Sequence, residues 1–359
     1  MKKRVAVFFT IFAFLCLLSA AAPAVAAQES PLCDLNGDGA LSASDAAVLL
    51  RGCSTGKYTE FSNPDCDFTG NGQIDQNDAR AMLLYAAGGI PDPVKFRERV
   101  SSGLCDEESF DRFCYAGIVS DQKGNYRSQD VSVSISSGDW ENSDYSIADI
   151  YIQDISCFVT AFSQGEFRGS TATVQDMFDS VNDGIIAMNG DFYSLHVYGP
   201  VIRNGVTYAA NITRNWDIAV LLTNGELRIY EYRVLTKEML AGMSVYQTWV
   251  FGPSLLDEES HAKTEFHSSL LPSNPRSVLG YYAPGHYAFL TVDGRTKVSK
   301  GLTMAQLSQL CEELGFVSAY NLDGGRSSIL LSRSGPINTP YKDGRPSSDI
   351  LAIRELPAE

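Results

Sequence analysis

The C-terminal part of the chain alternates apolar and polar residues with a period of two. Residues 131–136 read VSVSIS, residues 147–155 read IADIYIQDI and residues 157–162 read CFVTAF. This period is typical of β-strands with one buried face, because successive side chains point to opposite sides of a strand. Asn-Gly pairs at 204–205 and 224–225 separate further strand-like runs, and such pairs predict tight hairpins.

Two helices are expected to interrupt this strand pattern, at residues 173–181 and 303–315. Each begins with a threonine cap, and the residue three positions later can complete a capping box. The apolar positions fall on one face of each helix, namely Val174, Met177, Phe178 and Val181 in the first and Leu307, Leu310, Cys311 and Leu314 in the second. Residues 129–357 are therefore predicted to form an α+β domain that is mainly β, with a few amphipathic helices.

A secretory signal peptide is predicted at residues 1–27. Lys2, Lys3 and Arg4 precede an apolar run from 5 to 18, and small residues follow it up to Ala27. The run is shorter than a comfortable membrane span, and a retained N-terminal anchor is the alternative. We expect a secreted, extracellular protein that has no membrane contact after cleavage of the signal.

A repeat follows the signal, because residues 33–52 and 66–85 are similar to each other. Each copy begins with Cys-Asp and contains a loop of twelve residues with Asp, Asn and Gly at fixed offsets. The same offsets hold calcium in EF-hand loops, where a hard cation takes about six to eight oxygens. The predicted ligands are Asp34, Asn36, Asp38, Ala40 (main-chain carbonyl), Ser42 and Asp45 in the first loop, and Asp67, Thr69, Asn71, Gln73 (main-chain carbonyl), Asp75 and Asp78 in the second.

The repeat resembles a type I dockerin module over residues 31–89. In both copies the loop ends in Asp and leads directly into a helical pattern, with no helix before it. The resemblance implies a small all-α domain that binds two calcium ions and a cohesin module of a scaffolding protein, in a multi-enzyme complex of the cellulosome type. The alternative is a pair of Asx-rich turns without metal.

Residues 90–128 are predicted to be a linker or a small connecting element. Gly88, Gly89, Pro91 and Pro93 begin it, and it contains Cys105 and Cys114, which are close enough in sequence to close a small disulfide loop. Seven cysteines remain after the signal, so at least one is unpaired within the chain, and the connectivity stays open.

The composition excludes some functions. The chain has 28 Lys and Arg against 43 Asp and Glu, a formal charge of -15. Nucleic-acid binding is therefore not expected, because it requires a basic surface. The sequence also has no CxxC or Cys/His cluster, which argues against a zinc site.

Two predicted strands end in polar, glycine-bearing turns. The strand GIIAM leads to Asn189-Gly190-Asp191, and FVSAY leads to Asn321-Leu322-Asp323-Gly324-Gly325. Each strand follows one of the predicted helices, which suggests two related elements that arrive at one end of a sheet. Gly324 and Gly325 permit left-handed backbone and would let main-chain N–H groups form an anion-binding nest, although Asp-Gly-Gly is also a common hairpin turn.

Several motifs of this region are similar, in order and spacing, to those of the phosphodiester glycosidase family. They are MNGDFY, GPVIRNG, PRSVLGYY, FLTVDGR, GLTMAQLSQL, AYNLDGGRSS and GRPSSDILAI, within about residues 130–355. The resemblance implies a hydrolase that cleaves a sugar 1-phosphodiester, similar to a phosphodiester α-N-acetylglucosaminidase. This chain departs from the family pattern at Arg326, where a third glycine is common, and at Asp191, which is often glycine.

The resemblance and the chemistry together nominate the site residues. A phosphate leaving group needs little protonation, so the site must hold phosphate, stabilise charge at the anomeric carbon and activate water. The catalytic candidates are Asp323, as base or nucleophile, then Asp293, and Asp191. The substrate-binding candidates are Asn189, Arg276, Arg295, Asn321, Gly324, Gly325, Ser327, Ser328 and Arg345, because guanidinium groups suit phosphate oxygens and the amides and hydroxyls suit sugar or phosphate.

Alternatives to these roles remain open at this point. Each Arg/Asp pair is equally consistent with a structural ion pair, and Asp293 with a turn. His196 follows the NGDFY turn and is the one histidine placed to act in the site. For the whole domain, the alternatives are a non-catalytic glycan-binding or structural module displayed on a cohesin scaffold, and ordinary glycoside hydrolysis.

Overall fold

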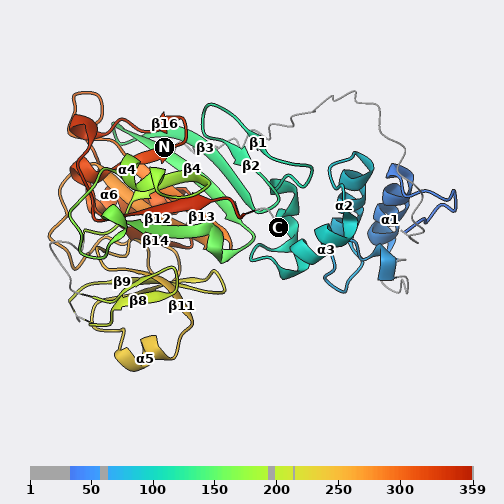
Figure 1. Cartoon of the computed structure of the whole chain (residues 1–359), viewed down its shortest axis with the longest axis horizontal. Helices are drawn as coiled ribbons and strands as arrows, with labels where there is room; N and C mark the ends of the chain where they lie inside the picture. Colours follow the sequence, from blue (N-terminus) through green and yellow to red (C-terminus); the bar gives the residue numbers. More distant parts are fainter. Residues whose placement is uncertain (1–32, 57–63, 193–198, 213–214, 358–359) are drawn as a thin grey trace, which may run out of the picture.

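The computed structural model describes residues 33–56, 64–192, 199–212 and 215–357. Helices α1 to α3 lie at one end of the molecule, and the β-strands with α4 and α6 form the larger body beside them (Figure 1). The expected β-rich domain with a few helices is therefore present. None of the described helices is long and apolar enough to cross a bilayer.

The largest sheet of the body has seven antiparallel strands. Its order is β1 (Val119–Ser120), β2 (Tyr126–Arg127), β3 (Val131–Trp140), β4 (Ser143–Ile152), β13 (His286–Val292), β12 (Arg276–Ala283) and β14 (Ser318–Asn321). Strands β3 and β4 pair along their full length, from Val131 opposite Ile152 to Trp140 opposite Ser143. The alternating segments predicted at 131–136 and 147–155 therefore fall mostly in one long hairpin.

A second antiparallel sheet has five strands. Its order is β16 (Gly335–Pro336), β15 (Leu330–Ser332), β6 (Gly184–Asn189), β17 (Asp349–Arg354) and β5 (Phe158–Phe162). Strand β6 is fully buried, and its side chains alternate between two cores: Ile186 and Met188 face the seven-stranded sheet, whereas Ala187 faces helix α4. A near-continuous apolar strand such as GIIAM is what burial on both faces requires.

Two smaller sheets complete the body. The three-stranded one contains β10 (Leu227–Tyr230), β9 (Ile218–Leu222) and β11 (Val245–Trp249), with the short helix α5 (Lys237–Ala241) between β10 and β11, and the two-stranded one contains β7 (Val201–Arg203) and β8 (Val206–Ala209). Both Asn-Gly hairpins are confirmed, since β7 pairs with β8 and β9 with β10. Asn204 and Gly205 both have positive φ, as the tight turn demands.

The two predicted helices cover the outer faces of the two large sheets. Helix α4 (Val174–Asp179) begins at the Thr173 cap, and α6 (Met304–Glu313) begins at the Thr303 cap, both with complete capping boxes. Their apolar faces are buried, as expected, against β6 and β17 for α4 and against β12 and β13 for α6. Each cap contributes on the order of 1 kcal/mol, so packing of the apolar face is the larger stabilising contribution.

The helical part contains the repeat. Helices α1 (Ala43–Thr55) and α2 (Gln76–Ala86) each start within a predicted calcium loop, and each has a capping box in which an Asp at N3 accepts from the main chain. The short 3-10 helix η1 (Pro64–Cys66) lies before the second loop. A disulfide joins Cys33 to Cys66, which are equivalent positions of the two copies. The helices share a core with Phe68 and Met82.

Residues 90–128 form an ordered connecting element. Helix α3 (Pro93–Ser102) and η2 (Glu107–Arg112) pack on α2 through Phe96 and Phe110, and Leu104 N donates to Gln153 O at 2.9 Å beside the end of β4. The disulfide-closed loop considered for this segment is wrong, because Cys105 and Cys114 are both free thiols. Cys105 is instead buried against β4, where its thiol donates to the Ile152 carbonyl.

Candidate active site

The polar turns that end β6 and β14 meet, although they come from different sheets. The expectation that both strands reach the end of one sheet was therefore wrong. The Asn189 side chain makes the connection: Nδ2 donates to the main-chain oxygen of Asp323 at 2.6 Å, and Oδ1 accepts from Ser277 Oγ at 2.8 Å and from Ile329 N at 3.2 Å. Asn189 is fully buried. Its side chain joins the two sheets, and it lies outside the lining of the cavity described below.

Asp323 lies just past β14 and is fixed by two neighbours. Ser327 Oγ donates to Asp323 Oδ2 at 2.5 Å, and Arg345 Nη2 lies 3.0 Å from Oδ1 and 2.7 Å from Oδ2. Arg345 Nε also donates to Ser327 Oγ at 2.6 Å, and its guanidinium stacks 4.7 Å from the Phe192 ring centroid. Burial raises the pKa of the Asp323 carboxyl above its ordinary value, while the bonds from Ser327 and Arg345 oppose that rise.

The glycine turn after Asp323 is shaped by close packing. A Cβ on Gly324 would lie 2.7 Å from the Pro275 carbonyl oxygen, and Gly325 has φ +67° with the Arg295 guanidinium 3.2 Å from where its Cβ would be. Gly325 N–H donates to Pro275 O at 2.9 Å. One of the N–H groups that were expected to face an anion, that of Gly325, is therefore already bonded within the protein.

A cavity of about 250 Å³ opens beside this turn. Six of the predicted residues line it, together with four that were not nominated; the full lining is Phe251, Leu270, Asn274, Arg276, Arg295, Asp323, Gly324, Gly325, Arg326 and Arg345. Four arginines thus surround a single carboxylate, in a chain whose overall charge is -15. This concentration of positive charge suits an anionic ligand.

Within the described residues, the lining arginines other than Arg345 have no carboxylate partner. Arg276 is buried, and it donates to the main-chain oxygens of Leu270, Pro272 and Leu302. Burial lowers the pKa of Arg276 to about 10, with Arg295 acting in the same direction, so the group stays charged at neutral pH. A buried cation without a counter-ion is costly, which indicates that the ligand supplies one.

The predicted residues Asp293, Asn321 and Ser328 lie around the cavity and outside its lining. Asp293 accepts from Asn338 Nδ2 at 2.8 Å and from Thr339 N at 3.0 Å, and burial raises its pKa. Asn321 Nδ2 donates to Gly252 O at 2.7 Å. Among described atoms, Asn321 Oδ1 and Ser328 Oγ are buried without a hydrogen-bond partner. Asp293 thus holds residues 338 and 339 in place, a structural role that differs from the turn considered for it in the sequence.

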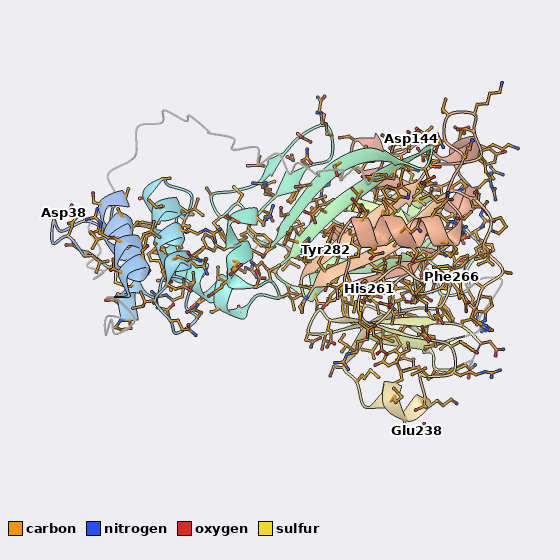
Figure 2. The ribbon with its side chains drawn as sticks, turned by 180° about the vertical axis from the view of Figure 1, so that it is seen from behind. Asp38, Asp144, Glu238, His261, Phe266 and Tyr282 are labelled. Atoms are coloured by element: carbon orange, nitrogen blue, oxygen red, sulfur yellow. A yellow bond between two sulfur atoms is a disulfide. The ribbon has the colours of Figure 1, made fainter. Side chains whose placement is uncertain are left out.

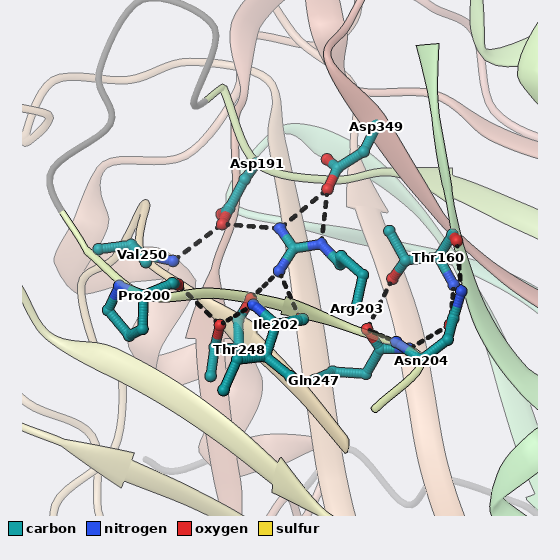
Figure 3. Close-up of polar contacts among 10 residues, drawn as sticks. All are labelled: Thr160, Asp191, Pro200, Ile202, Arg203, Asn204, Gln247, Thr248, Val250 and Asp349. Atoms are coloured by element: carbon teal, nitrogen blue, oxygen red, sulfur yellow. Dashed lines mark hydrogen bonds and ion pairs between the residues drawn. The ribbon is translucent and has the colours of Figure 1, made fainter. Parts of the chain in front are cut away.

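Asp191 belongs to a buried ion cluster and is also outside the lining (Figure 3). Arg203 Nη2 lies 3.3 Å from Asp191 Oδ2 and 2.8 Å from Asp349 Oδ2, and Val250 N donates to Asp191 at 2.9 Å. Burial raises the pKa of Asp191 to about 7, a rise that Arg203 opposes and Asp349 increases. The bond from Val250 N to Asp191 joins two segments that reach the site. Phe192, which follows Asp191, contacts Arg345, and Phe251, which follows Val250, lines the cavity.

Comparison with known sequences identifies this region. The model of the phosphodiester glycosidase family matches residues 182–354, which contain the whole cavity lining and the Asp191 cluster. These residues form a phosphodiester glycosidase domain. The resemblance noted in the motifs is confirmed for this stretch.

A relative also matches part of this chain. The SPbeta prophage-derived uncharacterized protein YomE of Bacillus subtilis (strain 168) is 28% identical over 152 residues, which are 40% of this chain and 23% of that protein. The chain therefore spans less than a quarter of that relative's length.

Two solved structures share the fold. The catalytic domain of zebrafish N-acetylglucosamine-1-phosphodiester alpha-N-acetylglucosaminidase, auto-inhibited by its pro-peptide, has a TM-score of 0.52 at 16% identity, over 63% of this chain and 83% of that one. A hypothetical protein from Synechocystis has a TM-score of 0.50 at 12% identity, over 63% and 62%.

Sequence reasoning missed several residues of the phosphodiester glycosidase domain. Arg203 and Asp349 lie in two of its motifs, but nothing in a single sequence shows that they meet. Phe192 and Phe251 carried no polar signal. Arg326 was noted only as a departure from the family pattern, yet it lines the cavity. His196 lies outside the described residues, as does the predicted signal peptide.

The first predicted calcium loop lies at the far end of the helical part, where Asp38 is labelled in Figure 2, whereas the second loop contacts η2. Carboxylate oxygens of Asp34, Asp38 and Asp45 lie within 4.8 Å of one another, a spacing that fits one cation with oxygen ligands. In the second loop Asp78 accepts from Thr69 N and Oγ1, and Asn71 Nδ2 donates to Glu107 on η2. Three of its predicted ligands, Thr69, Asn71 and Asp78, therefore make side-chain hydrogen bonds.

Proposed function

We propose that the phosphodiester glycosidase domain hydrolyses a sugar 1-phosphodiester within a polysaccharide or cell-surface glycan. In this reaction water adds to the anomeric carbon, the bond from that carbon to the phosphate oxygen breaks, and a phosphomonoester leaves. An α-linked N-acetylglucosamine is the first sugar to try, because the zebrafish protein that shares this fold is named for it.

The observation that carries the proposal is the imbalance of charge in the cavity. Arg345 is neutralised by Asp323, and Arg276 is charged and buried without a carboxylate partner among the described residues. Arg295 lies close enough to Arg276 to lower its pKa. The bonds that hold these two guanidinium groups use Nε and Nη2, so Nη1 of each can donate to one non-bridging oxygen of a phosphodiester.

Asp323 is the proposed base that removes a proton from the attacking water. It is the one carboxylate of the described lining, and its raised pKa improves proton abstraction. Ser327 and Arg345 hold its two oxygens, so the carboxylate is oriented before substrate arrives. A second carboxylic acid is not needed to protonate the leaving group, because a phosphomonoester is already a good leaving group.

The test is hydrolysis of an N-acetylglucosamine 1-phosphodiester by the purified mature chain, beside the Asp323→Asn variant and a matched aryl glycoside. The proposal predicts release of sugar from the phosphodiester in preference to the aryl glycoside, and loss of release in the variant with substrate binding retained. Binding without turnover by the wild type would mean a glycan-binding module. Equal cleavage of both substrates would mean ordinary glycoside hydrolysis.

We further propose that residues 31–89 act as a type I dockerin that binds two calcium ions and a cohesin module, and that the secreted enzyme is held in an extracellular multi-enzyme scaffold. The three convergent carboxylates of the first loop support a calcium site there. The equivalent capping boxes and the Cys33–Cys66 disulfide support a two-fold repeated unit. Among the described residues the second loop has no equivalent group of three convergent carboxylates, so we expect it to bind calcium more weakly.

Calcium titration of the chelator-treated chain tests this module. Two binding events are expected, and Asp38→Ala should remove one, because it deletes one of the three convergent carboxylates of the first loop. Among the described residues the exposed Asp38 side chain bonds only to Asn36 and Ala40, so the loop should keep its fold. Glu98→Gln, an exposed residue of α3, is the control with the same change of charge. A chain that takes up no calcium, or that binds type I cohesins equally with and without chelator, would contradict the dockerin proposal.

A further inference from the structure

Three exposed cations stand at the glycine turn and the 3-10 helix that faces it. Arg295 lies 5.6 Å and Lys342 5.3 Å from the ring centroid of Tyr341, so one aromatic ring positions both. Arg326 lies on η5 (Gly325–Ser327) and donates to the Gly344 carbonyl at 2.8 Å. We call Arg295, Arg326 and Lys342 the cationic rim.

The rim is held in place by a strained turn. Lys342 and Asp343, in η6 (Tyr341–Asp343), are consecutive non-glycine residues with positive φ, 52° and 57°. Such residues are strained, and they persist only where the surrounding structure imposes the conformation. Arg326 supplies part of that constraint through Nη2, which donates to Lys342 O at 3.4 Å and Gly344 O at 2.8 Å. The fold therefore keeps a lysine at this position at an energetic cost.

The rim carries more charge than one phosphodiester can neutralise. Inside the cavity, Arg345 is balanced by Asp323, and a phosphodiester held between Arg276 and Arg295 offsets only one of these two charges. Among the described residues no rim cation forms an ion pair, and this holds for Asp343 on the same turn as well. Up to three positive charges thus remain unmatched, in a chain with a net charge of -15.

We propose that the cationic rim binds a second phosphate, one repeat unit away from the phosphodiester that is cleaved. The substrate is then a polymer of sugars joined by successive phosphodiester linkages, which bears one negative charge per repeat. This inference rests on the proposed hydrolysis of a sugar 1-phosphodiester, and it names the class of substrate. Focusing of positive potential at the entrance also favours capture of such a polyanion.

The experiment compares two synthetic substrates with the same reacting sugar, one with a single phosphodiester and one with two in succession. The wild-type chain should have a kcat/KM about tenfold higher for the second, and the preference should shrink as salt screens the rim. Lys342→Gln should bring the preference to about twofold, because its ammonium lies over the Tyr341 ring and has no ion-pair partner among the described residues. Arg326→Gln should do the same, with some added loss on both substrates because it also holds the 342–344 turn.

Lys237→Gln, an exposed cation on α5, is the matched control and should keep the wild-type preference. Equal kcat/KM on the two substrates for the wild type, or a preference unchanged in Lys342→Gln, would overturn the inference and leave the proposed hydrolysis intact. Failure of the wild type to hydrolyse the single phosphodiester would instead overturn the proposed function.

Discussion

The side-chain amide of Asn189 donates to the main-chain oxygen of Asp323 across 2.6 Å, and this bond joins the end of β6 to the end of β14. The two strands belong to different sheets, so one buried amide sets how the sheets meet at the site. Asn189 Oδ1 also accepts hydrogen bonds from the Ser277 hydroxyl and the Ile329 N–H. Positioning of Asp323 therefore depends on a residue that lies outside the cavity.

Replacement of Asn189 tests this dependence. Asn189→Ala leaves Ser277 and Ile329 without their acceptor, and each buried polar group left unpaired costs about 1–3 kcal/mol. We expect a lower midpoint of chemical unfolding and a fall in kcat with little change in KM. Ser132→Ala, at a buried hydroxyl of β3, is the comparison. An unchanged kcat in a folded Asn189→Ala variant would show that Asn189 does not position Asp323.

Arg345 is expected to act through geometry as well as charge. Its guanidinium reaches both oxygens of Asp323 and the hydroxyl of Ser327, whereas a lysine offers one point charge and cannot make this set of bonds. Arg345→Lys should thus reduce kcat by about 100-fold, the effect of a misplaced catalytic group. Steady-state kinetics would show this loss, and activity within twofold of wild type would rule out a role for the fork.

The Asp191 cluster predicts a pH-dependent stability. Burial raises the pKa of Asp191 from an ordinary value of 3.8 to about 7, so between these values the folded chain holds a proton that the unfolded chain has lost. The contribution of Asp191 to stability is full below pH 3.8 and is lost as the pH rises to about 7. Relative to wild type, Asp191→Asn should therefore be less stable at pH 5 than at pH 8, as measured by the free energy of unfolding at each pH. A difference between variant and wild type that is the same at both pH values would contradict this.

Replacement of Arg203 tests the same cluster from the cationic side. Removal of the guanidinium leaves two buried carboxylates facing each other, and breaking a buried pair in this way costs about 3–5 kcal/mol. Arg203→Ala is expected to lower the unfolding midpoint far more than Arg228→Ala, since Arg228 pairs with Glu226 at the surface. Equal midpoints for the two variants in urea unfolding would show that the cluster is not structural.

Local elements of this fold were predictable because their signals are local. The Thr173 and Thr303 capping boxes mark the starts of α4 and α6, and Asn204-Gly205 marks a hairpin by its backbone preference alone. The partners of strands were not predictable. Strands β6 and β14 follow similar helices and end in similar turns, yet they enter different sheets, because pairing depends on contacts distant in sequence.

The candidate site was predictable where a motif and a cavity coincide. Asp323, Arg276 and Arg295 line the cavity as nominated, whereas Asp191 is in a buried ion cluster with Arg203. A sequence shows that a carboxylate is present but not which arginine neutralises it. The anion-binding role expected of Gly325 N–H also depended on an unseen neighbour, the Pro275 carbonyl.

The central claim is that the domain breaks the bond between the anomeric carbon and the phosphate oxygen. Hydrolysis of an N-acetylglucosamine 1-phosphodiester in water enriched in oxygen-18 tests it most directly, with mass spectrometry of the phosphomonoester product. We predict a phosphomonoester without the label, because water attacks carbon. A labelled phosphomonoester would mean attack at phosphorus, and it would contradict a glycosidase.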